Sequence, residues 1–122
     1  MVPSLFDKLG GEDVLEVAVN DLFRRSVGDP LIARWFGGIN AERQRAHLVA
    51  FVTVALDGPE NYGGKGMRAA HSGMRITRSA FDAFIQHFRD SLAAVGVSTH
   101  VIEQTMRRLE VLRIAVVERP RD

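Results

Sequence analysis

The sequence predicts an all-α fold in a single domain spanning residues 1–122, and three observations lead to this prediction. Apolar residues recur at steps of three and four through most of the chain, which is the spacing of one helix face. Capping residues and glycine pairs separate these stretches. The composition, with 46% hydrophobic and 25% charged residues, is that of an ordinary globular domain of about this length.

The N-terminal part is expected to hold three helical segments. Ser4 caps a short first helix, which Gly10-Gly11 ends. A longer helix runs from Glu12 to about Val27. Asp29 then caps a short helical segment that begins at Pro30 and carries Leu31, Ile32, Trp35 and Phe36.

The third long stretch begins after Asn40 and runs to about Leu56. Its end, residues 51–56, is rich in β-branched and aromatic residues and could be mistaken for a strand. The spacing of the preceding residues is helical and continues into it, so a helix is predicted; these residues are Gln44, His47, Leu48, Phe51 and Ala55.

Glycine and proline make residues 57–66 a long connection, and residues 67–73 are expected to form one or two helical turns. Thr77 then caps a long helix that Gly96 ends. Ser98 opens a last helix reaching Val116, with Pro120 beyond its end. We expect these two long helices to pack antiparallel. Connections longer than about eight residues are unusual in helical bundles, and such long loops often take part in function. We therefore expect the 57–66 loop to have a functional role.

Charge and composition exclude several classes of function. The net charge of +1 offers no attraction to nucleic acid or to an anionic membrane. The absence of cysteine excludes disulfides, thiol chemistry and Cys-ligated zinc. No apolar run approaches the roughly 18 residues of a membrane span, and residues 1–4 do not resemble a secretory signal. We therefore expect a cytoplasmic protein.

The four histidines are the candidate sources of chemistry. His71 follows the glycine-rich loop and the small residues Ala69 and Ala70, so it is either an ordinary hydrogen-bonded histidine or a ligand to iron beneath a flat cofactor. His47 is either a polar residue at a helix edge or a second side chain pointing into the same cavity. We expect His87 and His100 to face solvent and assign neither a role. No two histidines are three or four apart, so no zinc site is encoded within one helix.

The aromatic residues allow two interpretations as well. They form a phenylalanine-rich core, or they line a slot for a flat aromatic cofactor. The residues concerned are Phe23, Trp35, Phe36, Phe51, Phe81, Phe84 and Phe88.

The order of these features resembles the truncated haemoglobins of group I from Leu5 to about Val116. The segments that carry the resemblance are Leu5-Phe6-Asp7-Lys8-Leu9-Gly10-Gly11, Asp29-Pro30 through Trp35-Phe36-Gly37-Gly38, Arg43-Gln44-Arg45-Ala46-His47, Phe51 through Gly58-Pro59, Tyr62-Gly63-Gly64-Lys65-Gly66-Met67-Arg68 to His71, Gly73-Met74-Arg75-Ile76-Thr77 and Phe81-Asp82. Each segment alone is weak evidence for the family. The whole set in this order, with both glycine pairs in place, is a specific signature of it.

The resemblance implies a two-over-two helical globin that binds haem b (iron protoporphyrin IX), with His71 as the iron ligand. It implies that Phe36 packs on the haem and that Met67 and Arg68 contact it, with Arg68 or Lys65 pairing with the propionates. Phe51 and Phe84 are further haem-contact candidates. The ligand pocket would be formed by Phe23, Gln44, His47 and Leu48.

Two pocket positions depart from the family pattern. Most members have tyrosine where this chain has Phe23, and many have glutamine where it has Leu48. Both donors to a bound gas are therefore lost, which makes oxygen storage a poor fit. The stretch from Gln44 to His47 is similar to that of cyanobacterial members whose distal-helix histidine binds iron. We favour His47 as a reversible sixth ligand over His47 as a hydrogen-bond donor to bound gas.

The resemblance thus implies a haem protein that binds the diatomic gases O₂, NO and CO. It suggests nitric oxide dioxygenation or protection against reactive nitrogen and oxygen species, served by a reductase partner. The alternative is a bis-histidine haem protein for electron transfer or redox sensing. A haem-free helical interaction module is the third hypothesis. We expect a monomer or a weak dimer.

Overall fold

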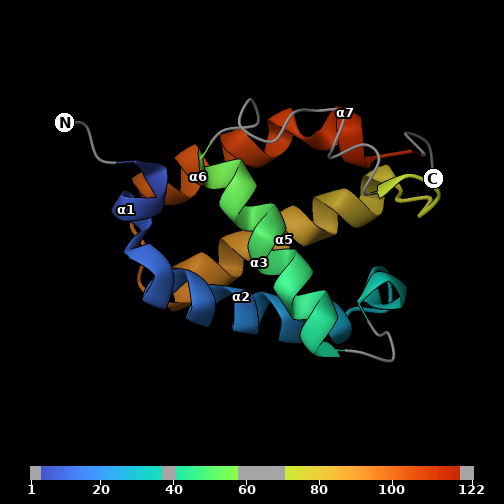
Figure 1. Cartoon of the computed structure of the whole chain (residues 1–122), viewed down its shortest axis with the longest axis horizontal. Helices are drawn as coiled ribbons and strands as arrows, with labels where there is room; N and C mark the ends of the chain where they lie inside the picture. The colour runs from blue at the N-terminus through green and yellow to red at the C-terminus, as the bar shows by residue number, and fades with distance from the viewer. Residues whose placement is uncertain (1–3, 37–40, 58–70, 119–122) are drawn as a thin grey trace.

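The computed structural model describes residues 4–36, 41–57 and 71–118, and the elements in these ranges are helices. Figure 1 shows their path. The elements are α1 (Leu5–Leu9), α2 (Gly11–Val27), a 3₁₀ helix η1 (Ala33–Trp35), α3 (Ala41–Asp57), α5 (Arg78–Ala94), α6 (Thr99–Val111) and α7 (Arg113–Val116). The all-α prediction is confirmed, and the β-prone end of the third stretch is helical as expected.

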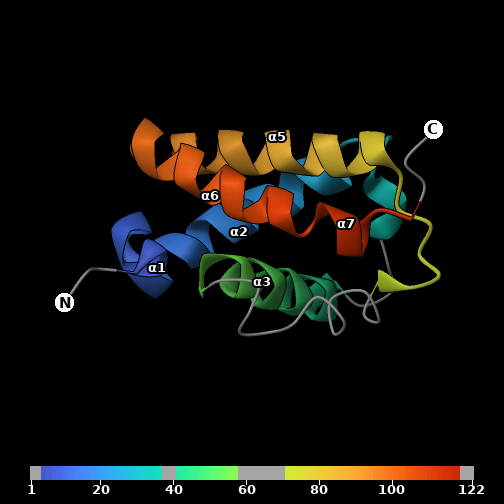
Figure 2. The ribbon, with the colours of Figure 1, turned by 90° about the horizontal axis from the view of Figure 1, so that it is seen from above.

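Four long helices form the body of the molecule as two pairs, α2 with α3 and α5 with α6. Helix α2 packs on α5 as well as on α3, and α6 packs on α3 as well as on α5. Figure 2 shows α5 and α3 on opposite sides, with α2 and α6 between them. The short connection Val95–Ser98 makes α5 and α6 antiparallel neighbours. This is the predicted two-over-two arrangement.

The predicted capping residues begin and end the helices. The hydroxyl of Ser4 accepts the Asp7 N–H at 3.1 Å, Thr77 accepts the Ala80 N–H at 3.0 Å and Ser98 accepts the Val101 N–H at 3.4 Å. Gly10 lies at φ +127°, and a Cβ there would come within 2.5 Å of Val14 Cγ2. Only glycine fits this junction between α1 and α2.

Two segments differ in detail from the expectation. The segment after Asp29 forms a turn and the 3₁₀ helix η1, because the Asp29 carboxylate and carbonyl take the first N–H groups, including that of Leu31 at 3.0 Å. The last predicted helix is divided into α6 and α7 at Leu112, whose N–H donates to the Leu109 carbonyl three residues back. Asn40, the 58–66 loop and Pro120 lie outside the described residues.

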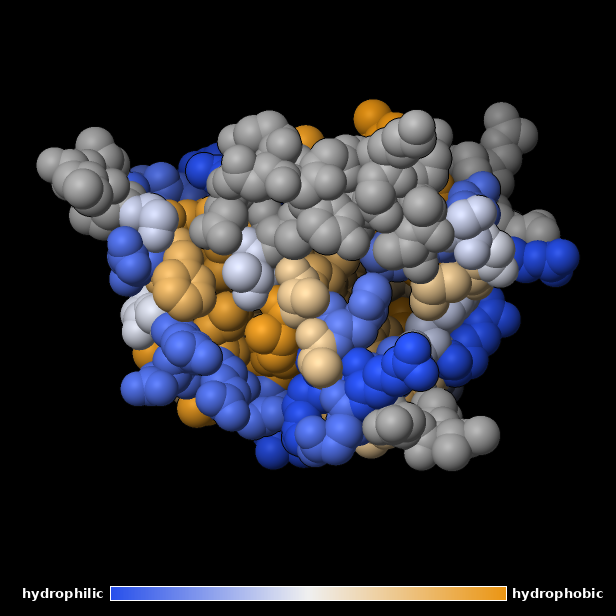
Figure 3. Space-filling view, in the orientation of Figure 1, coloured by the Kyte–Doolittle hydropathy of each residue, from blue (hydrophilic) through white to orange (hydrophobic). Residues whose placement is uncertain are grey.

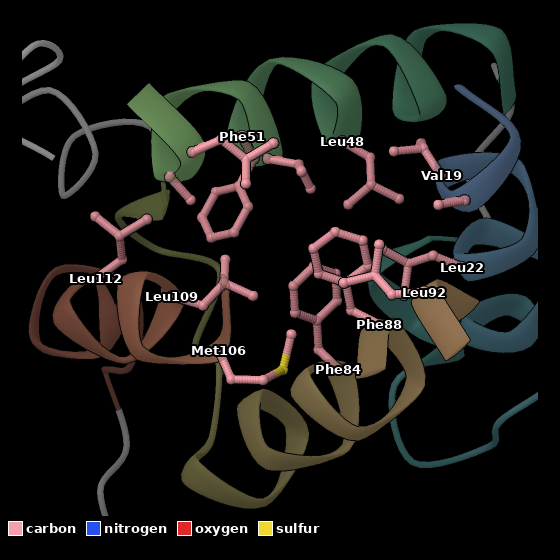
Figure 4. Packing of buried hydrophobic residues seen from close by; sticks show 14 of the residues in the cluster. Val19, Leu22, Leu48, Phe51, Phe84, Phe88, Leu92, Met106, Leu109 and Leu112 are labelled. Atoms are coloured by element: carbon pink, nitrogen blue, oxygen red, sulfur yellow. The ribbon is translucent and has the colours of Figure 1, made fainter. Parts of the chain in front are cut away.

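The core lies where the two helix pairs meet. Figure 4 shows Phe84 and Phe88 of α5 facing Leu48 and Phe51 of α3, with residues of α6 and α2 closing the sides. Phe88, Leu22, Leu92 and Leu109 have no exposed surface. Phe88 therefore belongs to the core of the domain, the first of the two interpretations offered for the aromatic residues.

Figure 3 shows apolar surface between α3 and the α1–α2 pair, edged by hydrophilic residues. A groove runs here, with an apolar floor that includes Phe6, Leu15 and Val49 and a rim that includes Glu12, Glu16, Glu42 and Arg45. In the parts of the chain that can be described, none of the helices combines the length and the apolar character needed to cross a bilayer.

Candidate functional site

An apolar cavity opens between α3, α5 and the segments around η1 and His71. It contains about 80 Å³ of space for solvent, and about 610 Å³ of atom-free space when its open mouth is included. The described lining residues are Ile32, Trp35, Phe36, Gln44, His47, Leu48, Phe51, His71, Met74, Ile76, Ala80, Phe81, Phe84 and Val116. The enclosed volume of about 80 Å³ is smaller than the roughly 300–1,000 Å³ of a usual ligand pocket. A large flat ligand would therefore occupy the open mouth as well as the enclosed part.

His47 and His71 meet at this cavity although 24 residues separate them in the chain. Their ring centroids are 5.6 Å apart, with the ring planes at 53°. His71 is buried, with 6% of its surface exposed. His47, which α3 presents one turn before Phe51, is exposed overall but lies against His71 with its ring. This arrangement agrees with the interpretation from the sequence in which both histidines point into one cavity.

Burial on its inner side lowers the pKa of the His47 imidazole below its ordinary value, and the nearby His71 lowers it further. Because the ordinary pKa of histidine is already about 6.5, His47 is neutral at pH 7. The neutral imidazole is the form that can bind a metal ion through a ring nitrogen.

A continuous series of ring contacts leads from the histidines into the core. The Phe51 ring meets His71 edge to face at 5.7 Å and Phe84 at 5.8 Å. Phe84 stacks on Phe36 at 6.2 Å with nearly parallel planes, 7° apart. Phe36 in turn meets Phe23 edge to face at 6.5 Å. The cavity wall is therefore built of interlocking aromatic rings, whose packing fixes their positions.

The structure brings together most of the residues singled out from the sequence. Phe36, Gln44, His47, Leu48, Phe51, His71 and Phe84 all line the cavity, as do Trp35 and Phe81 from the aromatic set. Phe23 supports Phe36 from α2 and is not among the lining residues. Lys65, Met67 and Arg68 lie outside the described residues.

Sequence reasoning missed the lining residues that come from the segment after His71. Met74 and Ile76 line the cavity from a stretch without regular structure, where periodicity gives no signal. Val116 was expected in a helix stripe, but nothing in the sequence indicates that this stripe reaches the cavity.

The expectation that His87 faces solvent is wrong. Its Nε2 lies 2.7 Å from Oδ2 of Asp29, and only 22% of its side chain is exposed. The partner follows α2 in the chain and is 58 residues away, so no local pattern could reveal it. His100 is exposed, as expected. Within the described ranges, no group of three or more His, Cys, Asp or Glu side chains could hold a metal ion.

Comparison with known proteins gives consistent relatives over nearly the full chain. A family model described as bacterial-like globin matches residues 4–118. A group 1 truncated haemoglobin from a Nostoc species (strain MUN 8820) is 33% identical over 116 residues, which cover 95% of this chain and 98% of the relative. One from Tetrahymena thermophila is 34% identical over 88% of this chain and 89% of its own.

Solved structures agree with these relatives. The Fe(III) form of the truncated haemoglobin from Tetrahymena pyriformis superposes with a TM-score of 0.82 at 30% identity, covering 94% of this chain and 98% of that one. A group II truncated haemoglobin from Bacillus anthracis, at 22% identity and a TM-score of 0.84, shares the fold.

Proposed function

Because the chain belongs to the group 1 truncated haemoglobins, we propose that its cavity holds haem b with His71 as the iron ligand and that it binds O₂, NO and CO there. The observation that carries this proposal is a buried imidazole, His71, with a second imidazole 5.6 Å away at an apolar cavity lined by aromatic rings. Haem is the cofactor that gives this family its name.

The residues present suit a haem group. Imidazole nitrogen is the usual protein ligand of haem iron in globins. Phe36, Phe51 and Phe84 offer apolar aromatic surface to a porphyrin ring, and Leu48 and Ile76 extend that surface. Lys65, Met67 and Arg68 stay predicted contacts. When bound, the haem supplies an iron centre that coordinates small gases and changes oxidation state.

Titration of the purified protein with haemin tests this proposal. We expect one equivalent to produce a Soret band, and His71→Ala to lose the band or bind haemin much more weakly. His100→Ala is the matched control, because His100 is exposed and outside the cavity. If His71→Ala and His100→Ala bind haemin equally well, His71 is not the ligand.

Beyond haem binding, we propose that His47 is a reversible sixth ligand. Its ring lies 5.6 Å from the His71 ring, and both residues line the cavity. Phe51 and Leu48 beside it are apolar, so they offer no hydrogen bonds that would hold water in its place. A gas would then bind only in the fraction of molecules in which His47 has moved away, and its apparent affinity falls by that fraction.

Absorption spectra of the ferric and ferrous protein decide between the two roles of His47. We expect low-spin spectra for the wild type and high-spin spectra for His47→Ala. A five-coordinate, high-spin ferrous wild type would assign His47 to hydrogen bonding with bound gas instead. Gln44 is another lining residue that can donate to a bound gas, through its side-chain amide.

For the physiological reaction we propose nitric oxide dioxygenation or related removal of reactive species, supported by a reductase. Facing histidines favour a second candidate, electron transfer or redox sensing by a bis-histidine haem. Consumption of NO by the oxygenated protein with a reductase present supports the first. Rapid cycling of the iron oxidation state with weak O₂ binding supports the second.

A further inference from the structure

The backbone immediately after His71 is held by Glu118, which follows α7. The Glu118 carboxylate accepts the Gly73 N–H at 3.1 Å through Oε2 and the Arg75 N–H at 2.8 Å through Oε1. The N–H of Glu118 itself donates to the Ile76 carbonyl at 3.0 Å. One residue thus makes three hydrogen bonds to the segment 73–76, which begins two residues after His71.

Trp35 holds the same segment through Met74, which lies between Gly73 and Arg75. Its indole Nε1–H donates to the Met74 carbonyl at 2.8 Å. The Met74 N–H donates back to the His71 carbonyl at 3.2 Å, which joins the held segment directly to the histidine. Trp35 and Met74 also line the cavity. Between them, Glu118 and Trp35 contact each residue of segment 73–76 through its backbone.

The conformation of this segment needs such support. Gly73 and Arg75 both have positive φ, +84° and +57°. Glycine adopts the left-handed region freely, but for Arg75 it is unfavourable and persists where the surroundings hold it. Two N–H groups separated by one residue create a concave, positively polarised surface that favours an anion. A carboxylate is the natural partner, and its charge makes both hydrogen bonds stronger.

The position of Glu118 is itself fixed by packing. Two residues earlier, Val116 is buried and lines the cavity. Arg113, at the start of α7, hydrogen-bonds Glu110 of α6 and Asp82 of α5 and lies over the Phe81 ring at 4.8 Å. The α7 segment is therefore attached to the first turns of α5, and it carries Glu118 to the segment after His71.

We propose that Glu118 is a positioning residue for His71, acting with Trp35 on the backbone of residues 73–76 and so fixing where the imidazole presents its nitrogen. The inference rests on the proposed role of His71 as iron ligand. If the segment is released, the imidazole samples more orientations, the iron–histidine bond becomes weaker and more variable, and haem leaves faster.

Resonance Raman spectra of the ferrous protein test this directly through the iron–histidine stretching band. The variants are made in a His47→Leu background, so that the sixth position is open whichever role His47 has. We expect Glu118→Ala to shift the band to lower frequency and broaden it. We also expect Glu118→Ala to raise the rate of haemin transfer to apomyoglobin by about tenfold, because two hydrogen bonds to a charged acceptor are lost.

Two further variants distinguish the loss of the Glu118 hydrogen bonds from a general loss of stability. Glu118→Gln keeps the size of the side chain but turns an NH₂ group toward one of the two N–H donors, so its effect should be intermediate. Glu103→Ala is the matched control, because Glu103 pairs with Arg89 between α5 and α6 and does not contact the segment. It should lower stability without moving the Raman band.

The outcomes distinguish a failure of the role of Glu118 from a failure of haem binding at His71. If the wild type takes up haemin but Glu118→Ala and Glu103→Ala have the same band and the same rate of haemin loss, the role of Glu118 is refuted while the proposed function stands. If the wild type takes up no haemin, the proposed function is refuted and this inference with it. Should Glu118→Ala fail to fold, an unchanged band in Glu118→Gln refutes the inference.

Discussion

The imidazole Nε2 of His87 lies 2.7 Å from Oδ2 of Asp29 and joins the middle of α5 to the turn that follows α2. The same Asp29 carboxylate accepts the Leu31 N–H through its other oxygen. The turn leads to Ile32, Trp35 and Phe36, which line the cavity. This pair therefore connects a helix of one layer to the segment that shapes the candidate site.

The Asp29 carboxylate makes stability depend on pH. The hydrogen bond from His87, and after it the Leu31 N–H, hold the pKa of Asp29 below its ordinary value of 3.8. A carboxyl with a lowered folded-state pKa adds stability above its unfolded pKa and loses it as pH falls through the folded value. We expect Asp29→Asn to unfold at lower urea concentration than the wild type at pH 6, with the difference shrinking as the pH falls below the ordinary Asp pKa of 3.8. Urea unfolding at several pH values measures this. A difference that stays constant down to pH 2.5 would contradict it.

Phe88 is predicted to be essential to the core and irrelevant to cofactor contact. It is fully buried and is not among the described lining residues of the cavity. Phe88→Ala should lower the free energy of unfolding by about 3–5 kcal/mol because it leaves a cavity in the core. Val111→Ala, at a site that is 61% exposed, is the control and should change it by less than about 0.5 kcal/mol. Phe84→Ala, in contrast, should alter the Soret maximum. If Phe88→Ala shifts the Soret band as much as Phe84→Ala does, the separation of core from cavity is wrong.

Thr77 is predicted to stabilise α5 through its cap. Its hydroxyl accepts the Ala80 N–H at 3.0 Å, and Thr77→Ala leaves that donor without its side-chain acceptor. We expect Thr77→Ala to lower the free energy of unfolding by about 1 kcal/mol. Thr77→Ser retains the hydroxyl and should therefore keep most of the stability of the wild type. Urea unfolding of both variants provides the measurement. Equal losses in the two would mean that the methyl group, and not the hydroxyl, matters here.

Haem should add to the stability of the fold, since it would fill a cavity between the helix layers. A ligand that binds the folded state alone stabilises it by an amount that grows with its concentration over Kd. We expect the thermal midpoint of the apoprotein to lie several degrees below that of the haem-loaded protein. His71→Ala should lose this difference. Equal midpoints for the wild type with and without haem would refute the prediction.

The helices could be predicted from the sequence because their signals are local. Ser4, Thr77 and Ser98 act on N–H groups three residues ahead, and Gly96 ends α5 with a φ of +90°. The division at Leu112 was missed because its apolar spacing is the same on both sides of the turn. Element boundaries that depend on one hydrogen bond leave no trace in periodicity.

The site was harder to predict, since its contacts join residues far apart in the chain. The resemblance to a known family directed attention to His71 and His47, whose meeting across 24 residues has no local sign. His87 with Asp29, Trp35 with Met74, and Glu118 with Gly73 are separated by 58, 39 and 45 residues. Such pairs are set by how the layers pack, which composition and spacing do not encode.

Trp35 is the single tryptophan of the chain, and it lines the cavity while its indole is hydrogen-bonded to Met74. Its fluorescence is therefore an internal optical probe of the cavity. A porphyrin lodged against it absorbs where the indole emits and would quench that emission almost completely. Recovery of the emission over time would report cofactor departure in a single sample, without a dye or a tag.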